Sequence, residues 1–292
     1  MIRVVRVLAP NPGPFTLEGT NTWVVGEGPS VVIDPGPEDE GHLGAVAREA
    51  GAVAAILLTH GHPDHAPGAD ALAREVHAPV MAFRPSVGQE RLRDEQLVEA
   101  GPVRLRVVHT PGHTPDHVVF LAEGARSLFT GDAVLGRGTS VVDPPEGDLA
   151  SYVRSLRRMQ SLEPRVLYPG HGPTVFHAAA KLEEYVTHRA MREDQVIAAL
   201  RSGLRTPGEM VATIYTGYSP DLFPAAERQV LATLLKLERE GRVKRTGAGD
   251  GSRFELVGDR RCERCGGVSM PRSRLCRRCS LDLLQERPER PS

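Results

Sequence analysis

The stretch Thr59-His60-Gly61-His62-Pro63-Asp64-His65 indicates the fold of this chain more strongly than any other. It follows an apolar run at 53–58 that predicts a buried strand. Gly61 and Pro63 prevent the strand from continuing and prevent a helix from starting, so the segment forms a loop. Three histidines and one carboxylate on a short loop are the donors of a metal site. A polar turn without a metal is the simpler alternative, but histidines seldom cluster in this way without a ligand.

The composition restricts the class of protein. A chain of 292 residues allows a large core and an additional small domain. Its 36 Lys and Arg against 37 Asp and Glu give a formal charge of −1, which neither favours nor excludes nucleic acid. The N-terminus lacks the apolar core of a signal peptide, and no apolar run approaches the roughly 20 residues that span a bilayer. We therefore expect a cytoplasmic protein without a membrane partner.

Strands that end on a polar turn recur along the first 200 residues. Hydrophobic periodicity predicts helices at 38–50, 66–76, 147–162 and 177–201, and strands at 2–8, 22–26, 30–34, 53–58, 79–83, 103–108, 117–122, 126–130 and 165–168. His113, Asp132 and His171 follow three of these strands. Loops at one edge of a sheet commonly hold ligands. The pattern predicts an α/β (α+β) domain of two packed sheets with helices outside.

The histidine loop and the later turns together supply enough donors for two metal ions. The candidate ligands are His60, His62, Asp64, His65, His113, Asp132 and His171. Three-ligand sites with an open position are typical of catalytic zinc. Two such ions can share a hydroxide that forms near neutral pH, so the reaction needs no Ser or Cys nucleophile. We expect Asp64 and Asp132 to be catalytic as well as metal-ligating.

The histidine loop matches the T-H-x-H-x-D-H signature of the metallo-β-lactamase fold, and Gly112-His113, Gly131-Asp132 and Gly170-His171 follow in that family's order. The resemblance covers residues 1 to about 200. It implies an αββα sandwich with a dinuclear site at one edge of the two sheets. The implied ligands are His60, His62 and His113 for the first zinc, Asp64, His65 and His171 for the second, and Asp132 as the bridge. The diiron branch usually has a carboxylate at the position of His62, so two Zn²⁺ are the expected cofactors, with manganese or iron as alternatives.

Further segments resemble the β-lactamase-like protein 2 group within this family. They are residues 11–22, 135–140, 168–173 and 188–193. Animal members of the group resemble endoribonucleases that act on single-stranded RNA, and fungal relatives resemble thioesterases that release polyketides from a carrier protein. The superfamily also contains glyoxalase II, which hydrolyses a glutathione thioester. The fold alone therefore does not decide the substrate.

A second domain is predicted at residues 201–258, after the catalytic domain at 1–200. Thr206-Pro207-Gly208-Glu209 has the pattern of a capping box with proline at the first helical position. Helices at 207–215 and 224–240 and strands at 242–245 and 253–257 complete the order of a winged helix. The resembling group also has a C-terminal winged helix.

The last residues contain two cysteine pairs, Cys262-x2-Cys265 and Cys276-x2-Cys279. In a chain with no other cysteine they predict one structural Zn²⁺ in a small zinc ribbon or knuckle at 259–283, followed by a flexible tail at 284–292. Residues 260–279 include seven arginines and one glutamate, a local charge of +6. Such a module suits nucleic acid, although a protein partner or a disordered tail is the alternative.

Other residues have weaker predicted roles. Asp34, Asp116 and His117 are expected to orient metal-bound histidine rings, and Asn21 and Thr139 to contact substrate. The leading hypothesis is a zinc-dependent endoribonuclease that hydrolyses single-stranded RNA with a metal-bridged hydroxide. The alternatives are a thioester hydrolase and a nucleic-acid-binding regulator.

Overall fold

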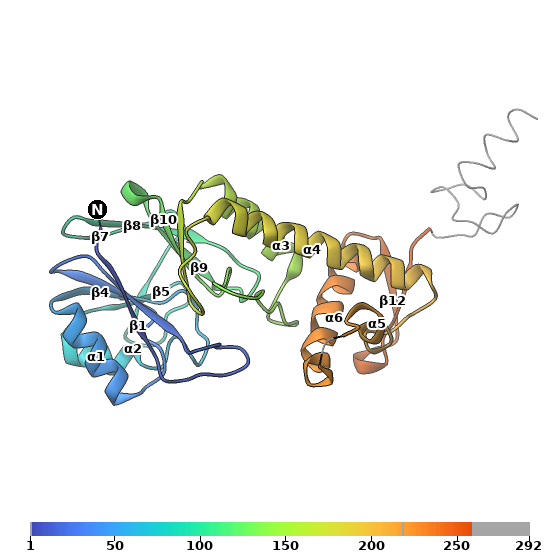
Figure 1. The fold of residues 1–292 in the computed structure, drawn as a ribbon, viewed down its shortest axis with the longest axis horizontal. Helices are drawn as coiled ribbons and strands as arrows, with labels where there is room; N and C mark the ends of the chain where they lie inside the picture. The colour runs from blue at the N-terminus through green and yellow to red at the C-terminus, as the bar shows by residue number, and fades with distance from the viewer. Residues whose placement is uncertain (1, 218, 259–292) are drawn as a thin grey trace, which may run out of the picture. The chain divides into compact units, whose positions relative to one another are not determined.

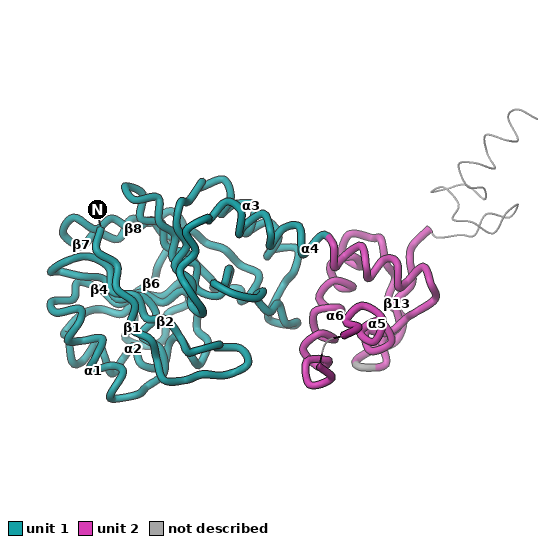
Figure 2. The backbone as a smooth tube through the Cα atoms, viewed as in Figure 1, with its two compact units in different colours: residues 1–190 teal, residues 191–292 magenta. Residues whose placement is uncertain are grey.

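A computed structural model describes residues 2–217 and 219–258 of the chain (Figure 1). The predicted zinc ribbon with its four cysteines and the tail at 284–292 lie outside the described residues. Two compact units, Met1–Ala190 and Met191–Ser292, make up the chain (Figure 2). No helix of the described part is both long enough and apolar enough to cross a bilayer.

The first sheet of unit 1 runs in chain order from β1 to β6. Its strands are β1 (Val4–Leu8), β2 (Asn21–Val25), β3 (Ser30–Ile33), β4 (Val53–Leu57), β5 (Val80–Ala82) and β6 (Glu90–Arg91). The first three strands pair antiparallel, and β3 to β6 pair parallel. Buried parallel strands favour β-branched and aliphatic residues, which the apolar runs of β3 and β4 supply.

The second sheet has the order β11-β10-β9-β8-β7. Its strands are β7 (Leu97–Ala100), β8 (Val103–His109), β9 (Val118–Ala122), β10 (Ser127–Gly131) and β11 (Val166–Pro169). The strands pair antiparallel except for β10 and β11, which are parallel. On β8, Arg104 is exposed while Val103 and Leu105 are buried, as its alternating sequence predicts.

The two sheets enclose one apolar core and α-helices cover their outer faces. Trp23, Ile33 and Leu57 of the first sheet pack in the same cluster as Phe120 and Phe129 of the second. Helices α1 (Glu40–Ala50) and α2 (Ala69–Val76) pack on the other face of the first sheet, and α3 (Leu149–Ser161) lies on the far side of the two sheets from them (Figure 1). This is the expected αββα arrangement.

Unit 2 has the expected winged-helix order. Its elements are the end of α4 (Ala178–Arg201), α5 (Pro207–Ile214), α6 (Phe223–Arg239) and the hairpin β12 (Val243–Thr246) and β13 (Arg253–Leu256). The capping box of Thr206 and Glu209 starts α5. Short 3₁₀ turns are η1 (Glu123–Ala125), η2 (Pro220–Leu222) and η3 (Gly249–Gly251). Val196, Ile197 and Leu200 of α4 belong to the core of this unit, which places the division between the units within α4 and before residue 200.

Candidate metal centre

Four strand ends bring the seven predicted ligands together. The loop after β4 carries His60 to His65, and it turns tightly because the amide N–H groups of His65 and Ala66 both donate to the carbonyl of His62. The turns after β8, β10 and β11 carry His113, Asp132 and His171 respectively. The side chains form two groups whose donor atoms lie within 4.8 Å of one another, namely His60, His62, His113 with Asp132, and Asp64, His65 with His171.

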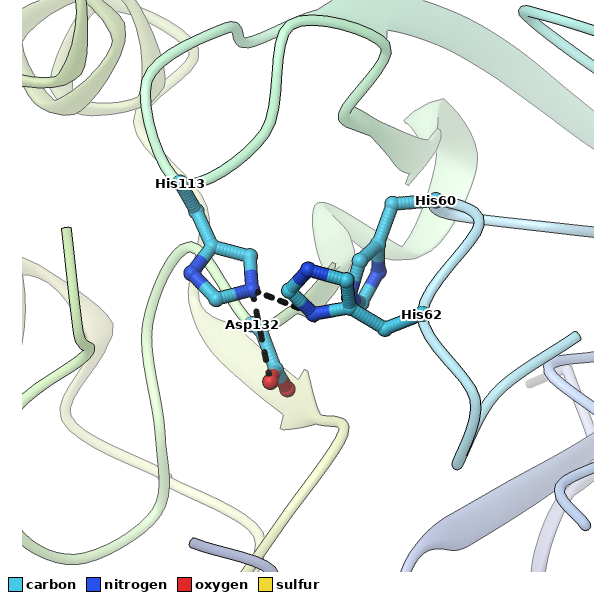
Figure 3. Close-up of side chains that lie close together, drawn as sticks. All are labelled: His60, His62, His113 and Asp132. Carbon is cyan, nitrogen blue, oxygen red and sulfur yellow. Dashed lines mark hydrogen bonds and ion pairs between the residues drawn. The ribbon is translucent and has the colours of Figure 1, made fainter. Parts of the chain in front are cut away.

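In the first group the donor atoms face a common point (Figure 3). His62 Nδ1 lies 3.1 Å from His113 Nε2, and His113 Nε2 lies 3.7 Å from Asp132 Oδ2. Around a tetrahedral zinc with Zn–N distances of about 2.0–2.1 Å, neighbouring ligand atoms lie roughly 3.3 Å apart. The spacing of these atoms therefore fits one ion.

The second group has similar spacing. His65 Nε2 lies 3.2 Å from His171 Nε2, and Asp64 Oδ2 lies 3.1 Å from His171 Nε2. Asp132 Oδ1 lies 3.4 Å from His65 Nε2 and 3.3 Å from His171 Nε2, while Asp132 Oδ2 faces His113 of the first group. One carboxylate thus directs one oxygen to each group, which is the arrangement of a bridging ligand.

For four of the five histidines, the other ring nitrogen has a hydrogen-bond partner that orients the ring. His60 Nδ1 lies 3.0 Å from Thr59 Oγ1, His65 Nδ1 lies 2.9 Å from Asp34 Oδ2, His113 Nδ1 lies 2.7 Å from Val141 O, and His171 Nδ1 lies 3.2 Å from Gly19 O. His62 Nε2 lies 4.0 Å from the exposed carboxylate of Glu146. Such partners fix which nitrogen faces a metal and raise its basicity.

The inward-facing Nε2 of His60 is buried and has no hydrogen-bond partner among the described residues. A buried polar atom left without a partner costs about 1–3 kcal/mol. Burial, followed by the charges of His65 and His113, holds the pKa of His60 well below its ordinary value. A neutral, buried imidazole with a free lone pair is the form that binds a metal ion. The donor set therefore fits the metals that the sequence predicts.

The carboxylates determine the protonation of the second group. Burial acts to lower the pKa of His65, but the charges of Asp132 and Asp34 outweigh it and raise that pKa well above its ordinary value. Burial is likewise outweighed at His171, where Asp132 and Asp64 raise the pKa to about 9. Burial acts to raise the pKa of Asp132, yet His65 and His171 hold it well below its ordinary value. Strongly shifted values are typical of functional sites.

Three of the residues expected to support or contact the site lie next to its ligands. Asp34 contacts His65 as expected, and it also accepts hydrogen bonds from the backbone N–H and Oγ1 of Thr59, at 2.8 and 2.7 Å. His117 is buried, and its Nε2 accepts from the backbone N–H of Asp132 at 3.2 Å rather than from a histidine ring. Asp116 lies beside Gly61 of the histidine loop.

The two predicted substrate contacts differ in their exposure. Asn21 is fully buried, and its side-chain amide donates to the carbonyls of Pro169 and Gly172, both at 2.9 Å. It therefore holds the turn that carries His171, and its contact with substrate stays a prediction. Thr139 is exposed, and its role stays a prediction.

Sequence reasoning did not identify several supporting groups. Thr59 acts through its side chain, and its place at the start of the T-H-x-H-x-D-H motif was a signal for it. Gly19 and Val141 act through backbone carbonyls, which any residue type supplies. Pattern alone therefore did not single them out.

Two facing sheets with paired His and Asp clusters at their strand ends define the class of metallo-β-lactamase-fold hydrolases. The comparison with known families agrees: residues 15–87 and 81–171 match the metallo-beta-lactamase superfamily, and residues 206–252 match the beta-lactamase associated winged helix domain. The chain belongs to the metallo-beta-lactamase superfamily and is an enzyme of the hydrolase type.

Individual relatives cover most of the chain. The beta-lactamase-like protein 2 homolog of Drosophila melanogaster is 36% identical over 82% of this chain and 89% of its own length. An atrochrysone carboxyl ACP thioesterase of Aspergillus chevalieri is 37% identical over 88% of this chain and 88% of its own length. The crystal structure of a metallo-beta-lactamase family protein from Thermus thermophilus is similar with a TM-score of 0.72, at 25% identity, over 87% of this chain and 98% of that one.

Proposed function

We propose that the chain is a zinc-dependent endoribonuclease that hydrolyses phosphodiester bonds of single-stranded RNA. His60, His62 and His113 would hold one ion, Asp64, His65 and His171 the other, and Asp132 would bridge them. Two divalent cations held there would activate a water molecule and polarise the scissile bond. The observation that supports this chemistry is the position of Asp132, whose two oxygens face the two groups.

The chain's own carboxylates would manage the proton of the attacking water. The side chain of Asp64 is 25% exposed against 13% for Asp132, so Asp64 is the more accessible of the two. Its Oδ2 lies 3.1 Å from His171 Nε2 and 3.4 Å from His65 Nε2, which hold it in place. We propose that Asp64 accepts this proton at Oδ1, the oxygen that does not face His65 and His171, as a positioned general base does.

The winged-helix unit supports RNA as the substrate class. Its β12–β13 hairpin exposes Lys244, Arg245 and Arg253, and the sequence after residue 259 adds seven arginines by residue 279. Exposed Lys and Arg side chains contribute affinity for a phosphate backbone without reading its sequence. A hydrolase of a small uncharged ester has no need of such a surface.

Thioester hydrolysis is the second candidate, because a relative that matches 88% of this chain is named an atrochrysone carboxyl ACP thioesterase. The same water would attack an acyl carbon, and Asp64 would accept its proton. In that case the basic hairpin would meet the acidic surface of a carrier protein rather than RNA. A nucleic-acid-binding regulator without catalysis is disfavoured, since all seven predicted ligands are in place.

A comparison of three substrates tests the proposal. Zinc-loaded protein is incubated with single-stranded RNA, with an acyl-glutathione and with an acyl-carrier thioester. We expect RNA cleavage, and a loss of about 100-fold or more in Asp132→Ala, because that variant lacks a group that both ions require. Asp70→Ala, which changes an exposed carboxylate on α2, is the matched control and should retain full activity.

The outcomes separate the candidates. RNA turnover that persists undiminished in Asp132→Ala would indicate a contaminating nuclease and would reject the proposal. Turnover of only a thioester, lost in the same variant, would replace the first candidate with the second. RNA binding without turnover of any of the three would favour the regulator.

A further inference from the structure

The segment after β10, residues 132–142, contains no helix or strand, yet it contributes to both groups of predicted metal ligands. It begins with Asp132, whose carboxylate faces histidines of both groups. Near its end, the carbonyl of Val141 accepts from His113 Nδ1 at 2.7 Å. A segment without a regular hydrogen-bond ladder depends on other groups to satisfy and fix its backbone. Its position therefore depends on the side chains around it.

Three buried hydroxyls hold the carbonyls and amides of this segment. Ser140 Oγ lies 2.5 Å from the carbonyl oxygen of Asp132 and 3.1 Å from that of Ala133, and the hydroxyl of Tyr152 donates to Ala133 O at 2.6 Å. The hydroxyl of Tyr185 accepts from the amide of Leu135 at 2.9 Å and donates to Gly138 O at 3.1 Å. Tyr152 and Tyr185 are fully buried, on α3 and α4.

A buried cation completes this arrangement. Arg189 of α4 is only 7% exposed, and its Nη2 donates to the carbonyl of Ser140 at 2.5 Å. Its guanidinium carbon lies 5.0 Å from the centroid of the Tyr152 ring. Burying a cation is costly unless it is paired and hydrogen-bonded. The guanidinium thus joins α4 to the segment through Ser140 and to α3 through Tyr152.

We infer that Arg189 is a positioning residue for the metal centre. Through the carbonyl of Ser140 and the ring of Tyr152 it fixes the segment that carries Asp132 and the carbonyl partner of His113. The inference rests on the dinuclear site proposed above and is independent of the substrate. Removing the guanidinium should loosen the segment, so that Asp132 and His113 no longer meet the ions in the same geometry.

Metal binding without any substrate tests this role. Groups that orient metal ligands typically change affinity by about 10- to 100-fold. We expect Arg189→Met to weaken Zn²⁺ binding by this factor in competition with a chromophoric chelator, and to change the visible spectrum of the Co²⁺-substituted protein. The thermal midpoint of the metal-free protein is measured alongside, so that a loss of fold is distinguished from a loss of metal affinity.

Two variants make the result specific to this guanidinium. Arg189→Lys keeps the charge and a donor but lacks the planar fork, so it should restore part of the affinity. Arg192→Met removes a guanidinium from the same helix, where it lies 4.3 Å from the ring of Tyr215 in unit 2. That variant should bind zinc like the unmodified protein.

Two further variants cover the case in which Arg189→Met does not fold. Ser140→Ala and Tyr152→Phe each remove one hydroxyl and should each weaken Zn²⁺ binding. Where Arg189→Met does fold, its effect and that of Ser140→Ala should be less than additive, since both act on one segment.

An unchanged Zn²⁺ affinity and Co²⁺ spectrum in Arg189→Met would overturn the inference, as would unchanged binding in both hydroxyl variants. An equal loss of affinity in Arg192→Met would do the same. A failure to cleave RNA would instead reject the proposed function and leave this inference standing, because zinc binding is measured without RNA.

Discussion

Protons compete with metal at His171. Its ring is buried, but Asp132 and Asp64 raise its pKa to about 9, so the metal-free protein carries this proton at neutral pH. A histidine must lose its proton to ligate a metal. The carboxylates that are predicted to hold the metal therefore hold the proton in its absence.

Metal uptake should consequently release a proton and strengthen with pH. We expect the apparent Zn²⁺ affinity to rise between about pH 7 and about pH 9, and the part of the rise due to His171 to end once that residue is neutral in the metal-free protein. Calorimetry in buffers of different ionisation enthalpy measures the protons released. Uptake without proton release near pH 7 would contradict the assignment.

The metal-free fold should show the opposite dependence. Because the folded pKa of His171 lies above its ordinary value of 6.5, its contribution to the free energy of unfolding is complete below about pH 6.5. That contribution is lost as the pH rises toward about 9. The thermal midpoint of the chelator-treated protein should decline over this interval, and the decline should be smaller in His171→Ala.

Asp34 should set the affinity of the second ion, because it accepts from His65 Nδ1 and from both donors of Thr59. An asparagine keeps the shape but has only one acceptor oxygen. We expect Asp34→Asn to weaken binding of one ion by about 10- to 100-fold, measured by chelator competition. Asp70→Asn serves as the exposed control, and equal binding by the two variants would argue against this role.

Single residues differ in how far the sequence could identify them. The seven donors were predictable because metal ligands are restricted to a few residue types at characteristic spacing. The hydrogen bonds of Asn21 to the turn that carries His171 were not predictable, because a small polar residue before a strand suits a substrate contact and a buried hydrogen bond equally well. The carbonyls of Gly19 and Val141 depend on how distant segments meet, 152 and 28 residues along the chain from their histidines.

Among the elements, those with a strong period were predicted within a few residues of their ends. Apolar spacing predicts three of these helices, α1, α3 and α4, and the central strands of both sheets. β6 and β7 were missed. β6 is two exposed residues long, and β7 is a short edge strand of which only every second residue is buried. Strands this short are defined by the neighbour they pair with rather than by their own pattern.

The turn after β11 packs closely against two of the predicted metal ligands at Gly170. A Cβ on Gly170 would lie 2.6 Å from Asp132 Oδ1 and 2.7 Å from His65 Cε1. Gly170→Ala should therefore displace two ligands, destabilise the fold by about 1–3 kcal/mol and weaken metal binding. Thermal unfolding and chelator competition measure the two effects.

Gly124→Ala is the matched control for this substitution. No atom lies within 4 Å of a Cβ at Gly124, in the short η1 turn between β9 and β10. It should leave both stability and metal binding unchanged. If Gly170→Ala behaved like this control, the packing of the turn against Asp132 and His65 would not be required for the site.

At the scale of the whole molecule, the order of elements was predictable and the division between units was not. The winged helix follows from two helices and a hairpin after a capping box. The end of α4 belongs to the core of unit 2 through Val196, Ile197 and Leu200, although the helix is continuous in sequence and structure. A continuous helical period contains no signal for a domain boundary.

The cysteine-rich end of the chain lies outside the described residues, and its predicted zinc ion can be tested by metal content and RNA binding. Four thiolates in two C-x2-C pairs suit one tetrahedral zinc ion, so the full chain should bind three zinc ions and Cys262→Ser with Cys265→Ser only two. The double variant should bind single-stranded RNA less tightly, with a weaker dependence on salt, because the predicted zinc ion would no longer hold the surrounding arginines. Hydrolysis of a small ester should be unaffected.

Ser273→Ala with Ser280→Ala keeps all four thiolates and is the control. RNA affinity that stays the same in the cysteine variant would show that this module serves another partner.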